Sequence, residues 1–140
     1  DALNDAVVCS AQAGRTLTLR VSIDGKLALD VRGDGVIVAT PTGSTAYALA
    51  AGGPVIDPRL KAFVVVPICP SYPKPNPLVV PIDSRIEIEP TRAERKAFVV
   101  VDGQVAAKLK SREKATFYRS DKPARFFRWG EFYRKVREKL

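Results

Sequence analysis

A short stretch of the chain concentrates hydroxyl groups, at Thr40, Thr42, Ser44 and Thr45. The sequence over residues 40–47 is Thr-Pro-Thr-Gly-Ser-Thr-Ala-Tyr and follows an apolar run, so it predicts a strand, a tight turn and then a helix. Hydroxyls and the free backbone N–H groups at the start of a helix are groups that bind sugars and phosphates. The stretch is therefore a candidate site for a ligand that carries such groups.

Two side chains beside this stretch add to its binding chemistry. Tyr47 offers a flat ring that can stack on a base, and Asp34 stands between two glycines, where its carboxylate can accept a hydrogen bond from a ligand. The same sequence also fits a helix without a ligand, capped by Ser44 and Thr45 after a tight turn at Gly43. These residues alone leave both alternatives open.

Several kinds of site are excluded by the composition. The chain has no His, which rules out a Ser-His-Asp arrangement and argues against a zinc site. It also lacks the Gly-x-x-x-x-Gly-Lys-Ser/Thr sequence of a phosphate-binding P-loop. Cys9 and Cys69 lie far apart in apolar runs, so we expect buried, reduced structural thiols in a cytoplasmic protein, not a disulfide or metal ligands.

The charge is strongly basic and unevenly distributed. The net charge is +8, and the excess gathers within residues 92–96, 108–114 and 122–139. Aromatic residues do not alternate with these basic ones along strands, so a solvated surface is favoured over a nucleic-acid site. The chain begins with Asp1 and has no Met, signal peptide or membrane-length apolar run. We therefore expect an internal or processed piece of a longer protein, with neither nucleic acid nor a membrane as partner.

The dominant period of the sequence is two residues, which is typical of strands with one buried face. Residues 16–23 alternate polar and apolar side chains, Asp-Gly at residues 24–25 suits a tight hairpin turn, and residues 26–31 alternate again. A second Asp-Gly pair, at residues 102–103, separates two later candidate strands. Many short strands with closely spaced turns predict antiparallel sheets. Further strands are expected at residues 36–39, 62–66, 78–80, 85–89, 97–101, 104–109 and 114–118.

Three segments depart from this period. Residues 45–51 are rich in Ala and predict a short helix, and residues 131–140 predict a charged amphipathic one. Residues 67–81 hold six of the eleven prolines and predict an extended loop at the surface or at a subunit contact, because proline cannot serve in an inner strand. The predicted fold is therefore mainly β: an antiparallel β-sandwich over residues 1–125 with one short embedded helix, followed by a C-terminal helical segment over residues 126–140.

Four parts of the sequence resemble the NAD kinase family and occur in the family's order. Residues 34–47, together with Ala-Gly-Gly-Pro at residues 51–54, resemble its long central signature. Leu-Asn-Asp at residues 3–5 resembles its Asn-Glu/Asp motif, with Asp in place of the commoner Glu. Residues 67–81 resemble its later proline-rich segment, without the His often found there, and Val-Asp-Gly-Gln at residues 101–104 resembles its late turn. Together these parts span nearly the whole sequence.

The resemblance implies one half of a two-domain enzyme. In the family, an N-terminal α/β domain carries a Gly-Gly-Asp-Gly motif with the general-base aspartate, and a C-terminal β-sandwich supplies much of the NAD site. The present sequence lacks that motif, so no catalytic residue and no metal ligand are expected within it. Part of the aromatic group in residues 126–140 is expected to pack on the first domain. The implied NAD-binding residues are Asn4, Asp5, Arg15, Arg32, Asp34, Thr42, Thr45, Ala46, Tyr47, Ala48, Leu49, Ala50, Cys69 and Gln104.

The activity that the resemblance implies is phosphoryl transfer to the 2′-hydroxyl of the adenosine ribose of NAD. ATP or polyphosphate is the expected donor, accompanied by Mg²⁺ or another divalent cation, and the domain is expected to assemble a homodimer or homotetramer. The matches of Arg15, Arg32 and Cys69 rest on spacing more than on a motif. Two other classes stay open: a non-enzymatic β-sandwich that binds an anionic partner through the basic C-terminal third, and a related lipid or sugar kinase.

Overall fold

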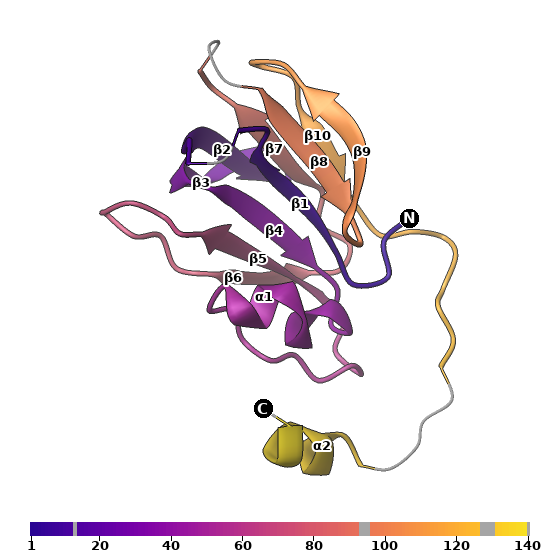
Figure 1. Ribbon diagram of the computed structural model, residues 1–140. Helices are drawn as coiled ribbons and strands as arrows, with labels where there is room; N and C mark the ends of the chain where they lie inside the picture. Colours follow the sequence, from indigo (N-terminus) through magenta and orange to yellow (C-terminus); the bar gives the residue numbers. More distant parts are fainter. Residues whose placement is uncertain (13, 93–95, 127–130, 140) are drawn as a thin grey trace.

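Two antiparallel sheets form the body of the molecule in the computed structural model, which describes residues 1–12, 14–92, 96–126 and 131–139 (Figure 1). Within these residues one sheet has six strands in the order β6-β5-β4-β1-β8-β9, and the other has four in the order β10-β7-β2-β3. The strands of the first sheet are β1 (Asp5–Ser10), β4 (Gly35–Ala39), β5 (Ala62–Ile68), β6 (Leu78–Pro81), β8 (Ala97–Val101) and β9 (Gln104–Leu109). Those of the second are β2 (Leu17–Ile23), β3 (Lys26–Gly33), β7 (Ile86–Pro90) and β10 (Ala115–Phe117). The predicted antiparallel sandwich is confirmed.

The main core lies between the two sheets. Strands β2 and β7 bury alternate side chains there, such as Leu19, Val21 and Ile88, while their other side chains face solvent. The first sheet is buried on both faces at its centre, because a smaller core that includes Val7, Ile37 and Val66 lies on its outer face. This explains why β1, β4 and β5 are continuous apolar runs instead of alternating ones. For the same reason, the sequence of β1 does not alternate between polar and apolar residues, and β1 is not among the predicted strands.

The hairpin turns match their prediction. Asp24 and Gly25 join β2 to β3 with φ values of 51° and 77°, and Asp102 and Gly103 join β8 to β9 with 45° and 81°. Both pairs lie in the left-handed region that a two-residue turn of type I′ requires. The two turns differ in their surroundings: the Asp24 carboxylate accepts one backbone hydrogen bond, and the Asp102 carboxylate accepts three.

The proline-rich segment is only partly a loop, which corrects the prediction from its composition. Pro67 belongs to β5, an inner strand, and pairs with Val36 of β4. The pairing of β5 with β6 ends at Val65, so at Pro67 the strand has a neighbour on one side only and tolerates a missing N–H. Pro81 ends β6, which is an edge strand. The residues between Ile68 and Leu78 form the predicted loop.

The embedded helix is shorter than predicted and is not capped by hydroxyls. A 3₁₀ turn, η1 (Gly43–Thr45), precedes α1 (Tyr47–Ala50), and neither has a side-chain cap hydrogen bond. Ser44 is fully buried and binds two other backbone segments: its hydroxyl donates to Pro41 O at 2.7 Å and accepts from Ile56 N at 2.9 Å. The predicted role of Ser44 and Thr45 as caps is therefore wrong. Ser44 instead links the turn by hydrogen bonds to Ile56, in the segment between α1 and β5.

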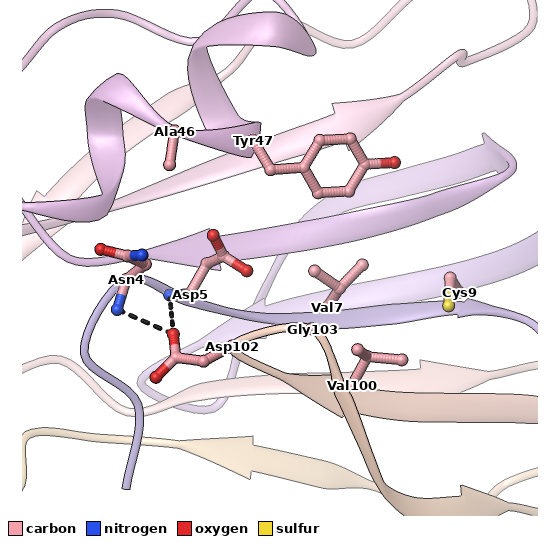
Figure 2. A pocket seen from close by; sticks show the side chains of 9 residues that line it. All are labelled: Asn4, Asp5, Val7, Cys9, Ala46, Tyr47, Val100, Asp102 and Gly103. Atoms are coloured by element: carbon pink, nitrogen blue, oxygen red, sulfur yellow. Dashed lines mark hydrogen bonds between the residues drawn. The ribbon is translucent and has the colours of Figure 1, made fainter.

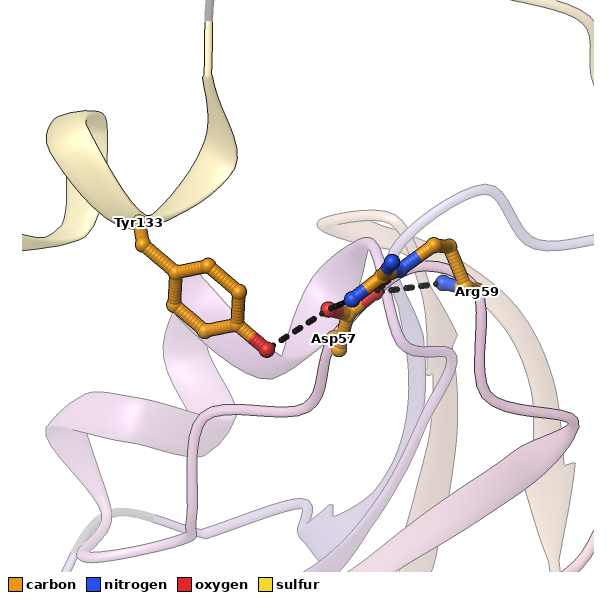
Figure 3. A network of polar contacts seen from close by, with 3 residues as sticks. All are labelled: Asp57, Arg59 and Tyr133. Carbon is orange, nitrogen blue, oxygen red and sulfur yellow. Dashed lines mark hydrogen bonds and ion pairs between the residues drawn. The ribbon is translucent and has the colours of Figure 1, made fainter.

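The C-terminal helix α2 (Phe132–Lys139) lies apart from the sheets, beyond α1 (Figure 1). Its Tyr133 hydroxyl donates to Asp57 Oδ2 at 2.8 Å, and Arg59 holds both carboxylate oxygens of the same aspartate (Figure 3). Arg59 and then Tyr133 lower the pKa of Asp57 well below its usual value. Phe126 and Tyr133 are exposed, while Phe127 and Trp129 lie outside the described residues. Packing of this segment on another domain stays a prediction.

No helix in the described part of the chain is sufficiently long and apolar to span a membrane.

Candidate functional site

A cavity of about 330 Å³ opens on the outer face of the six-stranded sheet, where α1 leaves β1 and β8 uncovered. Four predicted site residues line it: Asn4, Asp5, Ala46 and Tyr47. They come from the start of β1 and the start of α1, two segments that are far apart in the sequence (Figure 2). The remaining lining residues are Val7, Cys9, Val100, Asp102 and Gly103. Sequence reasoning does not predict them as binding residues, although Asp102 and Gly103 belong to the turn that resembles the family's late motif.

The start of β1 is held in place from two sides. On one side, the Asp102 carboxylate accepts hydrogen bonds from Leu3 N at 2.6 Å, Asn4 N at 2.8 Å and Asp5 N at 3.1 Å. On the other, Thr40 N donates to Asn4 O at 2.9 Å, and the Thr40 hydroxyl donates to Leu3 O at 2.7 Å. The backbone of residues 3–5 is therefore hydrogen-bonded from two turns, and the Asn4 and Asp5 side chains line the cavity.

Gly43 allows the turn to approach this segment. Its N–H donates to the Thr40 hydroxyl at 3.0 Å, and its α-carbon faces the backbone of Asn4 so closely that any Cβ would overlap the Asn4 carbonyl group. Only glycine fits there, for steric reasons alone. The Thr45 hydroxyl donates to Thr42 O at 3.4 Å, so most of the hydroxyls in this stretch bind the protein's own backbone. Exposed Thr42 carries the hydroxyl left for a ligand.

Asp5 and Asp102 both line the cavity, and their pKa values are shifted in opposite directions. Burial, and then the charge of Asp102, raise the pKa of Asp5, whose residue is only 7% exposed. Burial also acts to raise the pKa of Asp102, but its three backbone donors outweigh that effect and lower it. Asp102 is thus a firmly ionised group that faces inward to the backbone. Asp5 is a poorly solvated carboxylate to which no described residue donates a hydrogen bond, so its oxygens remain available to a ligand.

Tyr47 forms one wall of the cavity. Its ring extends from the start of α1 over β1, with the hydroxyl directed toward the Cys9 end of the strand (Figure 2). Burial raises the pKa of Tyr47, followed by the nearby groups of Cys9, Cys69, Asp34 and Asp5. The hydroxyl therefore stays protonated and can donate a hydrogen bond. The residue is 47% exposed, so its ring is accessible for stacking on a planar ligand.

The other predicted residues do not line the cavity. Asp34 and Cys69 lie near enough to influence Tyr47, and Gln104 follows the lining residue Gly103. The expected burial of both thiols is wrong, because Cys69 is exposed and Cys9 is half-buried. Ala48 is fully buried in the smaller core under α1, so its side chain is unavailable to a ligand. The rest lie at exposed or half-buried positions outside the cavity lining: Arg15, Arg32, Thr42, Thr45, Leu49 and Ala50. Their contact with a dinucleotide stays a prediction.

The basic residues at the end of the sandwich are engaged elsewhere. Lys108 lies over the Phe98 ring, and Lys114 pairs with Glu87 at 3.2 Å. Neither they nor Lys110 line the cavity. The resemblance implies NAD as the ligand of this cavity. Replacing Lys108, Lys110 and Lys114 together by Glu is therefore expected to change the affinity for NAD less than about twofold, since exposed charges interact weakly with a distant site. Calorimetric titration with NAD measures this, and a steep, salt-dependent loss of affinity would place the binding site on the basic surface instead.

Comparison with known proteins gives a family for this arrangement. A family model described as the ATP-NAD kinase C-terminal domain matches residues 3–129. The NAD kinase of Methanothermobacter thermautotrophicus is 43% identical over 140 residues, which cover 99% of this chain and 50% of that protein. This chain thus spans about half the length of the curated relatives it matches.

Solved structures agree with this match. The structure of an NAD kinase from Archaeoglobus fulgidus in complex with ATP is similar with a TM-score of 0.86 and 36% identity, covering 99% of this chain and 53% of the other. Yeast NADH kinase complexed with NADH is similar with a TM-score of 0.76 and 34% identity, covering 82% of this chain and 33% of the other. The match extends over both sheets and over the segments that line the cavity, and so this chain belongs to the ATP-NAD kinase family, as its C-terminal domain.

Proposed function

We propose that this chain is the dinucleotide-binding domain of an NAD kinase. The intact enzyme transfers a phosphoryl group from ATP or polyphosphate to the 2′-hydroxyl of the adenosine ribose of NAD. The observation that carries this proposal is the convergence of Asn4, Asp5 and Tyr47, from two distant segments, on one cavity. The relatives solved with NADH and with ATP support the choice of ligands.

The cavity suits a dinucleotide because it combines three kinds of contact. The free oxygens of Asp5 and the amide of Asn4 suit ribose hydroxyls, the Tyr47 ring suits a base, and Val7 and Val100 supply apolar surface. In phosphoryl transfer the protein contributes mainly by positioning the reacting groups and stabilising charge. We assign the positioning of NAD to this domain and the general base to the half of the enzyme that this chain does not span.

The divalent cation belongs with the phosphoryl donor in this proposal. Within the described residues no group of three or more His, Cys, Asp or Glu side chains could hold a metal ion. We therefore place the cation with the donor and assign it no ligand among the described residues. We further propose a homodimer or homotetramer, supported by the edge strand β9, whose Val105 is 63% exposed. A cytoplasmic location is consistent with two free thiols, Cys9 and Cys69.

The deciding experiment measures NADP formation. The full-length enzyme is expected to convert NAD to NADP with ATP or polyphosphate and Mg²⁺, whereas residues 1–140 alone are expected to bind NAD weakly and to give no NADP. Failure of the full-length enzyme to phosphorylate either NAD or NADH would refute the proposed reaction. Turnover by residues 1–140 alone would place a general base within them, with Asp34 and Asp102 the first to test by substitution.

A further inference from the structure

A single carboxylate organises the start of β1. Asp102 accepts hydrogen bonds from three consecutive backbone N–H groups, those of Leu3, Asn4 and Asp5, at 2.6, 2.8 and 3.1 Å. These residues are 97 to 99 positions away in the sequence. Asp102 N also donates to Asp5 O at 3.0 Å, so the two segments are joined in both directions. A carboxylate that accepts several backbone hydrogen bonds forms stronger bonds than a neutral acceptor would.

The other Asp-Gly hairpin turn, at Asp24 and Gly25, shows that the turn itself does not require an aspartate that accepts three backbone hydrogen bonds. Asp24 has φ 51° and precedes a glycine, as Asp102 does with φ 45°. Its carboxylate accepts one backbone hydrogen bond, from Arg85 N at 2.8 Å, and it does not line the cavity. An aspartate in this turn therefore needs only one long-range partner. The additional donors at Asp102 all come from the segment that presents Asn4 and Asp5.

The opposite side of that segment is fixed by a different element. Thr40 binds the carbonyl groups of Leu3 and Asn4, and Gly43 packs against the Asn4 backbone. Residues 3–5 are thus held between the turn after β4 and the turn after β8. If Asp102 lost its charge, one of these two supports would weaken, and the side chains of Asn4 and Asp5 would no longer be fixed relative to Tyr47.

We propose that Asp102 is a positioning residue of the dinucleotide site: its carboxylate orients Asn4 and Asp5 by binding the backbone of residues 3–5. This inference rests on the proposed function. It also assigns a role to the Asp-Gly hairpin turn beyond reversing the chain. Asp102 acts through the residues that it orients, and the ligand contacts are made by them.

The test compares Asp102→Asn with Asp24→Asn in the full-length enzyme. Asn tolerates the left-handed conformation as well as Asp does, so both variants keep their turns. In Asp102→Asn the remaining side-chain oxygen can still accept, but the new NH₂ group cannot. Either Leu3 N, which binds one carboxylate oxygen, or Asn4 N and Asp5 N, which bind the other, therefore lose their partner. We expect kcat/KM for NAD to fall on the order of tenfold in Asp102→Asn and to change less than about twofold in Asp24→Asn. Hydrogen exchange at the amides of Leu3, Asn4 and Asp5 is expected to accelerate in Asp102→Asn alone.

The outcomes separate positioning from mere stability. Equal losses of kcat/KM in the two variants would overturn the proposal, because Asp102 would then matter only as a turn residue. Unchanged exchange at residues 3–5 in Asp102→Asn would also overturn it. If the wild-type enzyme binds NAD but forms no NADP, the proposed reaction fails, while the exchange rates and the NAD affinities of the two variants still decide the role of Asp102. A wild-type enzyme that does not bind NAD refutes both.

Discussion

Replacement of Gly43 by Ala is expected to lower the stability of the domain by on the order of 3 kcal/mol and to reduce kcat/KM for NAD at least about a hundredfold. The added Cβ would overlap the carbonyl group of Asn4, which is backbone and cannot rotate away. The turn and the start of β1 must therefore separate. That separation breaks the bonds of Thr40 to both segments and pulls Tyr47 away from Asp5.

The matched control for this substitution is Gly52→Ala. Gly52 has φ +89°, and a Cβ there meets nothing within 4 Å, so the variant suffers backbone strain without a collision. We expect it to lose about 1 kcal/mol and to keep its affinity for NAD. Thermal denaturation and steady-state kinetics of the two full-length variants measure both effects. If Gly43→Ala is as stable and as active as Gly52→Ala, the close approach of the turn to Asn4 is not needed for the site.

The second expected result is that Asp5→Asn stabilises the protein at neutral pH and impairs it as an enzyme. Burial and Asp102 raise the pKa of Asp5 above its usual value, so the folded state binds the proton more tightly than the unfolded state does. The stabilising contribution of that proton is fully present below the unfolded pKa and is lost as the pH rises through the folded pKa. At neutral pH the wild type therefore bears an ionised, poorly solvated carboxylate, and the neutral Asn removes this penalty.

The pH dependence provides the check on this reasoning. The melting temperature of Asp5→Asn should exceed that of the wild type at about pH 7, and the difference should shrink as the pH falls toward about 4. Since a charged acceptor for the ligand is lost, kcat/KM for NAD should fall about ten- to hundredfold. Asp30→Asn, at an exposed position in β3, serves as the control for loss of a surface carboxylate. A variant that is less stable than the wild type at neutral pH, or equally active, would contradict this account of Asp5.

The sequence is a good guide where a local pattern determines the structure. Alternation with a period of two places β2, β3 and β7 within one or two residues of their observed bounds, and both Asp-Gly pairs form the expected turns. Strand β1 escapes prediction because both of its faces are buried, which removes the alternation. The sequence also does not predict Pro67 in an inner strand. Proline is tolerated there because the neighbouring strand β6 ends its pairing with β5 at Val65, and where that pairing ends depends on the tertiary structure.

The site is only partly predictable, for a similar reason. The hydroxyls of residues 40–45 are expected to face a ligand or cap a helix, but Thr40 and Ser44 bind backbone groups of distant segments. Their composition indicates hydrogen bonding without indicating the partner. The sequence identifies Asp102 as a turn residue, and its Asp-Gly-Gln context as part of the family resemblance. Its contact with residues 3–5 spans most of the chain, so no local pattern could reveal it.

The order of strands in the six-stranded sheet has a consequence for synthesis on the ribosome. β1 is made before the other described strands, yet it lies inside the sheet between β4 and β8. Its pairing with β4 can form early, but its other edge has no partner until Ala97–Val101 has left the exit tunnel. Throughout that interval the nascent chain exposes an apolar strand edge, the kind of surface on which neighbouring chains aggregate and to which chaperones bind. Because Asp102 follows β8 directly and lines the cavity, we expect the last pairing of β1 and the completion of the cavity wall in the same late step of translation.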